Sequence, residues 1–179
     1  GLMRKKRDNS ESNYSSNNSS ESKGKIVMHV DLDCFFVSAG LLNHPNREAL
    51  KNAPIAVTHA KNDNFNVADS SADISSCNYE ARSFGIKNDM YIKEALRLCP
   101  HLQMIPYDFD AYNRASCTFY EILSGWASEF QGISCDEAFI ELDETSGLDP
   151  ESAAQAIRAE IKQKCQIDAS IGIGPNMLI

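Results

Sequence analysis

HVDLDCFF, residues 29–36, is the stretch that indicates the fold of this chain. An apolar run over residues 26–28 leads into Asp31 and Asp33, and a second apolar segment begins at Cys34. This order is typical of a buried strand that ends at a carboxylate just before a helix begins. We therefore expect Asp31 and Asp33 at the mouth of a strand.

A second acidic pair, Asp136 and Glu137, lies in a segment over residues 133–142 that alternates apolar and polar residues. Such alternation predicts a strand or hairpin. Neighbouring side chains on a regular strand point to opposite faces, so both acids can act together only near a bend. If this strand lies beside the first, carboxylates from both converge, and such hard oxygen ligands suit one or two Mg²⁺ ions. The alternative is that they are solvated acids at strand ends.

Five motifs surround these acids in a fixed order: HVDLDCFFVS (29–38), SCNYEARSFGIKNDM (76–90), YDFDAY (107–112), SCDEAFIEL (134–142) and ASIGIG (169–174). In this order and spacing, the chain from about Lys25 to its end resembles the Y-family translesion DNA polymerases. Within that family it is most similar to the eukaryotic REV-type deoxycytidyl transferase.

The resemblance implies metal ligands. Asp31, Asp136 and Glu137 correspond to the side-chain ligands of two Mg²⁺ ions, and the carbonyl oxygen of Leu32 corresponds to a backbone ligand. Asp33 matches the motif without being a usual ligand in the family. We expect Asp31, Asp136 and Glu137 to be catalytic.

The resemblance also implies that five consecutive residues line the nucleotide site: Leu32, Asp33, Cys34, Phe35 and Phe36. The resemblance makes Phe36 the steric-gate aromatic, whose ring occupies the space that a ribose 2'-hydroxyl needs. Phe35 is expected beneath it. The alternative for both rings is ordinary core packing.

Tyr79 and Arg82 lie three residues apart and share one face of a predicted helix. A guanidinium fork suits phosphate oxygens, and a phenol supplies one more donor, so this pair can hold a triphosphate. The resemblance adds Ser76 and Asn88 as contacts of the incoming nucleotide. The alternative for the first pair is a surface cation stacked on a ring.

The periodicity predicts an α+β fold. Strands are expected near residues 26–30, 55–58, 102–105, 133–142 and 170–173 with a short strand into Ser76, and helices near 34–43, 79–84, 92–98 and 112–126 and from Pro150. The resemblance implies a polymerase palm, which is a split βαβ, ferredoxin-like sheet, with a small fingers segment. We expect the palm at residues 26–43 and 106–179, the fingers at 44–105 and a Ser/Asn-rich tail at 1–25. Without a thumb and little finger, we expect a truncated fragment that is inactive alone.

Charge is distributed unevenly along the chain. The first 25 residues carry six basic and three acidic residues, and the remainder carries 11 basic and 22 acidic residues. A body of net charge −11 is a poor free-standing DNA-binding module, but it is compatible with a palm that concentrates acids around metals. The run Arg4-Lys5-Lys6-Arg7 is compatible with nuclear entry or with a weak nucleic-acid contact, and the alternative is a basic run that is only solvated.

Composition excludes other classes of protein. Six cysteines lack any C-x-x-C spacing, so zinc binding and a disulfide framework are not expected. No apolar run approaches a membrane span of about 20 residues, and no secretory signal is present. We expect a nuclear protein without a membrane partner.

The expected function is template-directed nucleotidyl transfer in translesion synthesis, with primer–template DNA and a deoxynucleoside triphosphate as partners. The resemblance implies dCTP, inserted opposite guanine or an abasic site, and further replication and repair proteins bound through other regions. The arginine that selects cytosine in that enzyme type has no counterpart here, since neither Arg4 nor Arg7 lies in a matching context. The alternatives are a broader-specificity Y-family polymerase, a non-catalytic palm scaffold and a cyclase-like palm.

Overall fold

The computed structural model describes residues 26–59, 72–142 and 147–177. One sheet contains β1 (Val27–Leu32), β5 (Ala127–Gly132), β6 (Glu137–Leu142) and β7 (Ala169–Gly174), and a second contains β2 (Ile55–Thr58), β3 (Ile74–Cys77) and β4 (Gln103–Ile105). The helices are α1 (Phe35–Leu41), α2 (Arg47–Leu50), α3 (Tyr79–Ser83), α4 (Ile92–Leu98), α5 (Phe109–Trp126) and α6 (Pro150–Cys165). None of the helices in these described ranges is long and apolar enough to cross a membrane.

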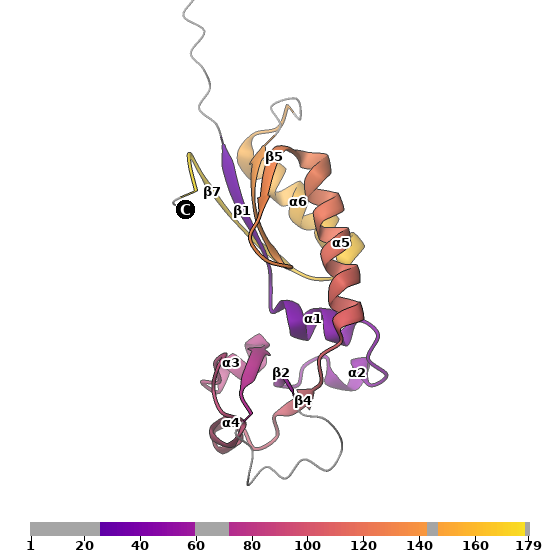
Figure 1. Cartoon of the computed structure of the whole chain (residues 1–179), viewed down its shortest axis with the longest axis vertical. Coiled ribbons are helices and arrows are strands. Elements are labelled where there is room, and N and C mark those ends of the chain that lie inside the picture. Colours follow the sequence, from indigo (N-terminus) through magenta and orange to yellow (C-terminus); the bar gives the residue numbers. More distant parts are fainter. Residues whose placement is uncertain (1–25, 60–71, 143–146, 178–179) are drawn as a thin grey trace, which may run out of the picture.

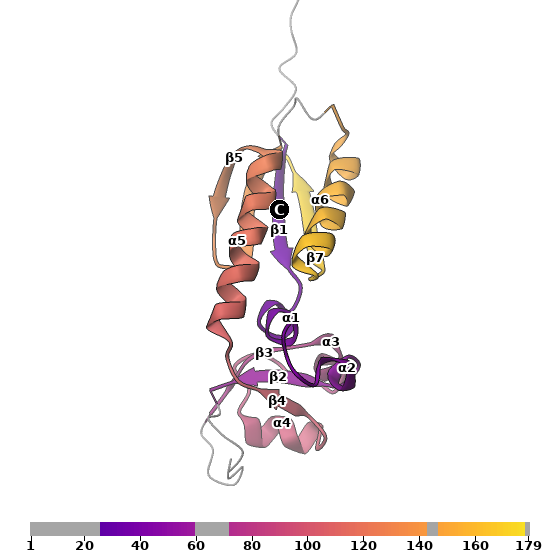
Figure 2. The ribbon, with the colours of Figure 1, turned by 90° about the vertical axis from the view of Figure 1, so that its right-hand side faces the viewer.

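The first sheet has the strand order β5-β6-β1-β7, and all neighbouring strands are antiparallel. Helices α5 and α6 both cover one face of it, as Figures 1 and 2 show. Strands β1 and β5 run in the same direction with β6 between them, so the connection through α5 is a split βαβ unit. This confirms the predicted α+β, ferredoxin-like sheet.

Alternation along β1 separates a core face from an open face. Met28, Val30 and Leu32 are buried and pack in the same cluster as Phe119 of α5. The intervening positions, including Asp31, are half-buried and point to the face opposite α5 and α6, which we call the open face. A hydrophobic strand therefore delivers a carboxylate to the open face.

The second sheet is inserted between β1 and α5 and has the strand order β3-β2-β4. Strand β2 is antiparallel to β3 and parallel to β4. Helix α1 joins the two sheets, because Phe35 and Ala39 are buried in the first core while Val37 is buried against Ile55 and Val57 of the second. The boundaries drawn between palm and fingers at residues 43/44 and 105/106 stay predictions.

Three local expectations differ from the structure. The predicted helix over residues 34–43 is shorter, because Cys34 has a left-handed backbone (φ 48°) and leads into α1 as its N-cap. The segment over 133–142 is a turn followed by β6, and its hairpin partner β5 was not expected. Helix α2 was also not expected. The predicted tail at 1–25 lies outside the described residues.

Candidate active site

The two acidic motifs meet at the end of β1. Asp31 is directly opposite Glu137 in the antiparallel register of β1 and β6. One residue further, the amide of Leu32 donates to the carbonyl oxygen of Asp136 at 3.0 Å. Asp136 lies in the turn and Glu137 is the first residue of β6, so the predicted bend between the two acids is present.

Tyr120 of α5 supports this turn from the helix side. Its hydroxyl is 2.6 Å from the carbonyl oxygen of Ser134 and 3.1 Å from that of Glu137. The amides of Ile133 and Ser134 also donate to the carbonyl oxygen of Glu137, at 2.9 and 3.2 Å. Hydrogen bonds to backbone carbonyl oxygens therefore fix the path of the chain on which the acids lie.

The three carboxylates interact electrostatically. Burial raises the pKa of the Asp31 carboxyl, and the negative charges of Asp136 and Glu137 raise it further, whereas His29 opposes the rise. A raised pKa in an Asp means that the ionised form is disfavoured in the folded protein. A nearby cation would relieve that cost, and three carboxylates are the ligands that Mg²⁺ prefers.

Two of these side chains are turned toward protein partners in the structure. Glu137 Oε1 is 2.6 Å from His29 Nε2, and Asp136 Oδ1 accepts a short hydrogen bond from the Ser134 hydroxyl. In the described part of the chain, no three Asp, Glu, His or Cys side chains are consequently arranged to hold a metal ion. The donor types fit Mg²⁺, and their use as ligands requires rotation of Asp136 and Glu137.

Asp33 is held between β1 and β7. Its amide donates to the carbonyl oxygen of Asp168 at 2.8 Å, and its carboxylate accepts from the Ser170 hydroxyl at 2.7 Å. The Ser38 hydroxyl donates to its carbonyl oxygen at 2.9 Å. These bonds fix the strand-to-helix turn in which Cys34 adopts its left-handed conformation.

Helix α3 brings the predicted phosphate-binding pair to the same place. Tyr79 and Arg82 share one face, with the guanidinium carbon 5.4 Å from the ring centroid. Asn78 anchors the helix, because its side-chain oxygen accepts from the amides of Ala81 at 3.0 Å and Ile55 at 2.8 Å. Burial, followed by the charge of Asp33, raises the pKa of Tyr79, so its phenol stays protonated and can donate.

One cavity collects most of these groups. It has a volume of about 380 Å³. Its lining residues come from β1, the following turn, α3 and β7: His29, Asp31, Asp33, Cys34, Tyr79, Arg82, Ser170 and Gly172. One predicted metal ligand, Asp31, and the predicted phosphate ligands Tyr79 and Arg82 thus face one space, although Asp31 and Arg82 are 51 residues apart in the sequence.

The other predicted site residues do not line this cavity: Leu32, Phe35, Phe36, Ser76, Asn88, Asp136 and Glu137. Phe36 is half-buried and packs against both cores, and Phe35 beside it is 2% exposed and belongs to the first core. Ser76 is buried on β3 opposite Val57. Asn88 is exposed, and its side-chain oxygen is 3.9 Å from the Cys77 thiol.

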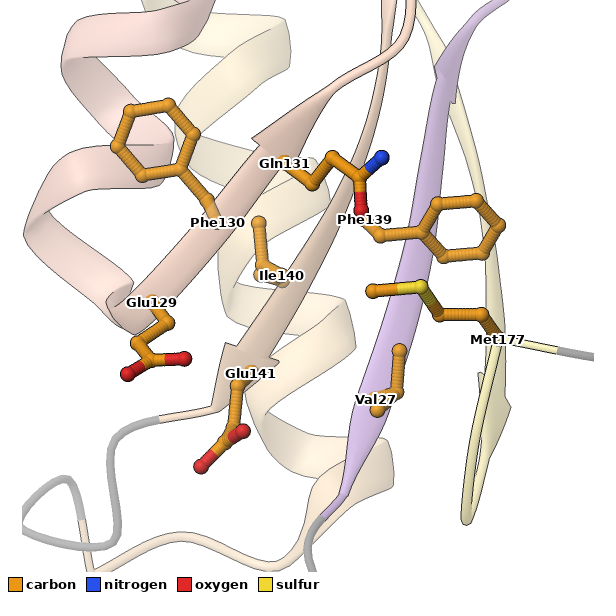
Figure 3. Close-up of a pocket in the computed structure, with 8 residues that line it drawn as sticks. All are labelled: Val27, Glu129, Phe130, Gln131, Phe139, Ile140, Glu141 and Met177. Atoms are coloured by element: carbon orange, nitrogen blue, oxygen red, sulfur yellow. The ribbon is translucent and has the colours of Figure 1, made fainter.

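A second hollow lies farther along the open face of the first sheet. It has a volume of about 280 Å³ and contains none of the predicted site residues. Figure 3 shows Val27, Phe139 and Met177 gathered on one side and the carboxylates of Glu129 and Glu141 on another. His29 connects this hollow with the first, because its ring lies 4.7 Å from that of Phe139.

Comparison with known proteins decides the family. Residues 30–179 match the impB/mucB/samB family. The chain belongs to the Y-family of DNA polymerases. Membership of the Y-family confirms the resemblance read from the five motifs and explains why they recur in this order.

Individual Y-family relatives are similar over most of this chain. The DNA repair protein REV1 of Arabidopsis thaliana is 40% identical over 163 residues, which cover 91% of this chain and 14% of that protein. DNA polymerase IV of Escherichia coli is 37% identical over 153 residues, which cover 83% of this chain and 40% of that protein. The insertion ternary complex of Dbh DNA polymerase superposes with a TM-score of 0.72 at 27% identity, over 86% of this chain and 43% of that one. The chain therefore spans less than half the length of these relatives.

Sequence reasoning missed several residues that shape the site. His29 faces Glu137, Asn78 anchors α3, Tyr120 holds the acidic turn and Ser170 holds Asp33. His29 is part of the first motif, and its spacing of two residues from Asp31 could have placed it on the same face. Asn78 caps α3 through the nearby amide of Ala81, and an Asn just before a helix is a local signal that could have found it. Tyr120 and Ser170 act through partners that are distant in sequence, for which no local pattern exists.

Proposed function

We propose that this chain forms the nucleotidyl-transfer site of a translesion DNA polymerase, in which a primer 3'-hydroxyl attacks the α-phosphate of an incoming deoxynucleoside triphosphate. The observation that carries the proposal is the shared cavity. The end of β1 supplies carboxylates, and α3 supplies a cation and a phenol, which is the complementary pair of groups that a metal–triphosphate complex needs. Membership of the Y-family supports the same activity.

Asp31, Asp136 and Glu137, with the carbonyl oxygen of Leu32, are the proposed ligands of two Mg²⁺ ions. Bound Mg²⁺ would supply charge neutralisation and alignment of the attacking and leaving oxygens. The main-chain bond from Leu32 to Asp136 holds the two ligand-bearing segments together. Glu137 contacts His29 on the open face of the sheet, and it would exchange this contact for the metal by rotation of its side chain.

Arg82 and Tyr79 are proposed to bind the triphosphate, and Asp33 and Cys34 to form the adjoining wall. Arg82 presents several donors in a planar fork, which suits two phosphate oxygens at once. Phe36 is the proposed steric gate, supported by the buried ring of Phe35 at a centroid distance of 5.4 Å. For Ser76 and Asn88, the proposed contacts with the nucleotide would be made from the second sheet.

Further proposals concern the nucleotide that is inserted, the cellular compartment and the partners. Similarity to REV1 proteins supports insertion of deoxycytidine opposite guanine or abasic sites and a role in the nucleus. Primer–template DNA, dCTP and further repair proteins are the proposed partners of the whole protein. Similarity to DNA polymerase IV favours one alternative, a bypass polymerase that accepts all four nucleotides.

Calorimetric titration of dCTP into the 179-residue chain, with and without Mg²⁺, tests the site directly. We expect binding that depends on Mg²⁺ and that falls by more than about tenfold in Asp136→Ala, since even outer-shell changes cost metal sites about that much. Glu129→Ala removes an exposed carboxylate from the same sheet and serves as the matched control. Binding that is absent, or that is indifferent to Mg²⁺ and to Asp136, would favour a scaffold that only retains the fold.

Primer extension by the whole protein, opposite each template base and an abasic site, then separates the two polymerase alternatives. Strong preference for dCTP on every template supports the deoxycytidyl transferase. Insertion that follows Watson–Crick pairing on all four templates supports the broader enzyme.

A further inference from the structure

Phe36 and Tyr107 occupy the boundary between the two sheets. Both are partly buried, and both pack against the core of the first sheet and against the small cluster of Val37, Ile55, Val57 and Ile105. Tyr107 belongs to the short segment between β4 and α5, which is where the chain returns from the second sheet to the first. Its position is therefore set by both sheets.

Tyr107 is the centre of a group of rings. Its centroid lies 4.5 Å from that of His59 and 5.4 Å from that of Phe109, with which it stacks at an interplanar angle of 6°. Its contact with Phe36 is edge-on, at 6.3 Å and 68°. Stacked and edge-to-face geometries are the favoured arrangements of aromatic pairs, so rings on one chain segment restrain the ring of Phe36 on another.

The other two rings around Phe36 are more deeply buried than Tyr107. Phe35 and Tyr112 contact it at 5.4 and 4.9 Å, but both are buried members of the first core. Removing either one would leave a cavity in that core. Tyr107 is half-buried, so its ring can be removed with less damage to the fold.

We propose that Tyr107 is a positioning residue for sugar selection, acting through the ring of Phe36. The inference rests on the proposed function, because it requires Phe36 to exclude the ribose 2'-hydroxyl. A gate discriminates only if its ring cannot move aside, and an edge contact from a ring held by His59 and Phe109 opposes that movement. Without Tyr107, Phe36 gains space at its edge and yields to the hydroxyl.

The measurement is the ratio of the dissociation constants of CTP and dCTP in the presence of Mg²⁺. A packed ring that must be displaced gives the unmodified chain a ratio of about 5 to 100, which corresponds to the usual cost of overpacking. We expect Tyr107→Ala to lower the ratio by at least about fivefold, the lower end of that range, with little change in the affinity for dCTP. Tyr107→Phe retains the ring and is expected to keep the original ratio.

Two further variants show whether Tyr107 acts through Phe36. The double variant Phe36→Ala/Tyr107→Ala should have the same ratio as Phe36→Ala, because coupled residues are not additive. Phe84→Ala is the control. It removes an exposed aromatic ring that contacts His101 and not Phe36, and it is expected to leave the ratio unchanged. Tyr107→Leu replaces Tyr107→Ala if the latter does not fold, as judged by circular dichroism.

The outcomes separate the inference from the function on which it rests. If Phe36→Ala lowers the ratio and Tyr107→Ala or Tyr107→Leu keeps the original value, the role of Tyr107 is overturned and the gate remains. If Phe36→Ala itself keeps the original ratio, the proposed gate fails and the role of Tyr107 fails with it. An equal loss of CTP and dCTP binding in Tyr107→Ala would reduce Tyr107 to a structural residue.

Discussion

The hydroxyl of Tyr120 lies 2.8 Å from the point that a Cβ on Gly132 would occupy. Gly132 is the last residue of β5, and Tyr120 reaches over it to the turn that carries Asp136. A side chain at position 132 would therefore force the Tyr120 hydroxyl to shift from the place where it contacts that turn.

Gly132→Ala is expected to displace the Tyr120 hydroxyl and to lower the free energy of unfolding by about 1–3 kcal/mol, the usual cost of overpacking. Urea denaturation followed by circular dichroism measures it. Gly125→Ala is the matched control, because nothing lies within 4 Å of its added Cβ, and alanine in helix α5 should stabilise by about 0.5–1 kcal/mol. Equal stability of the Gly132→Ala variant and the original chain would contradict the proposed crowding.

Tyr112→Phe is expected to stabilise the protein. Tyr112 is 4% exposed, and its hydroxyl has no hydrogen-bond partner among the described residues. A buried unsatisfied polar group costs about 1–3 kcal/mol, so removing the oxygen while keeping the ring should recover part of that cost. A rise in the midpoint of urea unfolding checks the expectation, and a fall would mean that the hydroxyl has a partner in solution.

Asp31→Asn is expected to stabilise the metal-free protein at neutral pH. Burial and the charges of Asp136 and Glu137 raise the pKa of Asp31 in the folded state, so the folded state binds the proton more tightly than the unfolded state. Stability is then lost as the pH rises from the usual value of 3.8 through the raised value. The advantage of the amide should be present at pH 7 and should vanish below about the ordinary Asp pKa.

With Mg²⁺ bound, the original chain should become more stable than the Asp31→Asn variant, which reverses their order in the metal-free state. A cation bound only by the folded state stabilises it by mass action, and that gain requires the Asp31 carboxylate. Thermal denaturation at pH 7 with a series of Mg²⁺ concentrations measures both effects. A gain from Mg²⁺ that is the same for Asp31→Asn and the original chain would remove Asp31 from the proposed ligands.

Asn78→Ala is expected to weaken both the fold and the site. The side chain caps α3 and also donates to the carbonyl oxygen of Ala53 at 2.8 Å, so one residue ties the helix of Tyr79 and Arg82 to β2. Loss of an N-cap costs about 0.5–2 kcal/mol. Asn78→Asp keeps the capping oxygen and loses only the donor, so its unfolding free energy should fall less, and the affinity for dCTP should follow the same order.

Local pattern was sufficient for much of the fold. The run of apolar residues before Asp31 predicted β1, the period of α5 was visible from Tyr112 to Trp126, and Pro150 marked the start of α6. Strand β5 has the sequence ASEFQG, whose polar residues and glycine do not favour a strand. It exists because its backbone pairs with β6, and a partner in space cannot be read from a local pattern.

The candidate site also contains residues that a local pattern predicted and residues that it did not. The motif acids and the α3 pair were predicted because each has its own sequence context. Their supports, such as the contact of Ser170 with Asp33 across 137 residues, depend on the closed fold. The expectation that Asp136 and Glu137 need a bend rested on strand geometry alone, and the turn before β6 agrees with it.

Arg82→Ala is expected to weaken the binding of all four deoxynucleoside triphosphates by a similar factor. Phosphates carry no base identity, and the guanidinium lines the cavity beside Asp31 and Tyr79. A hydrogen bond to a charged group contributes about 1.5–3 kcal/mol, equivalent to roughly a 10- to 150-fold loss of affinity. Arg82→Lys keeps the charge without the planar fork, so its affinities should fall between those of the other two proteins. Titration of the four nucleotides into the three proteins measures the factors. A loss confined to one base would place Arg82 beside the base and would require a different cation for the triphosphate.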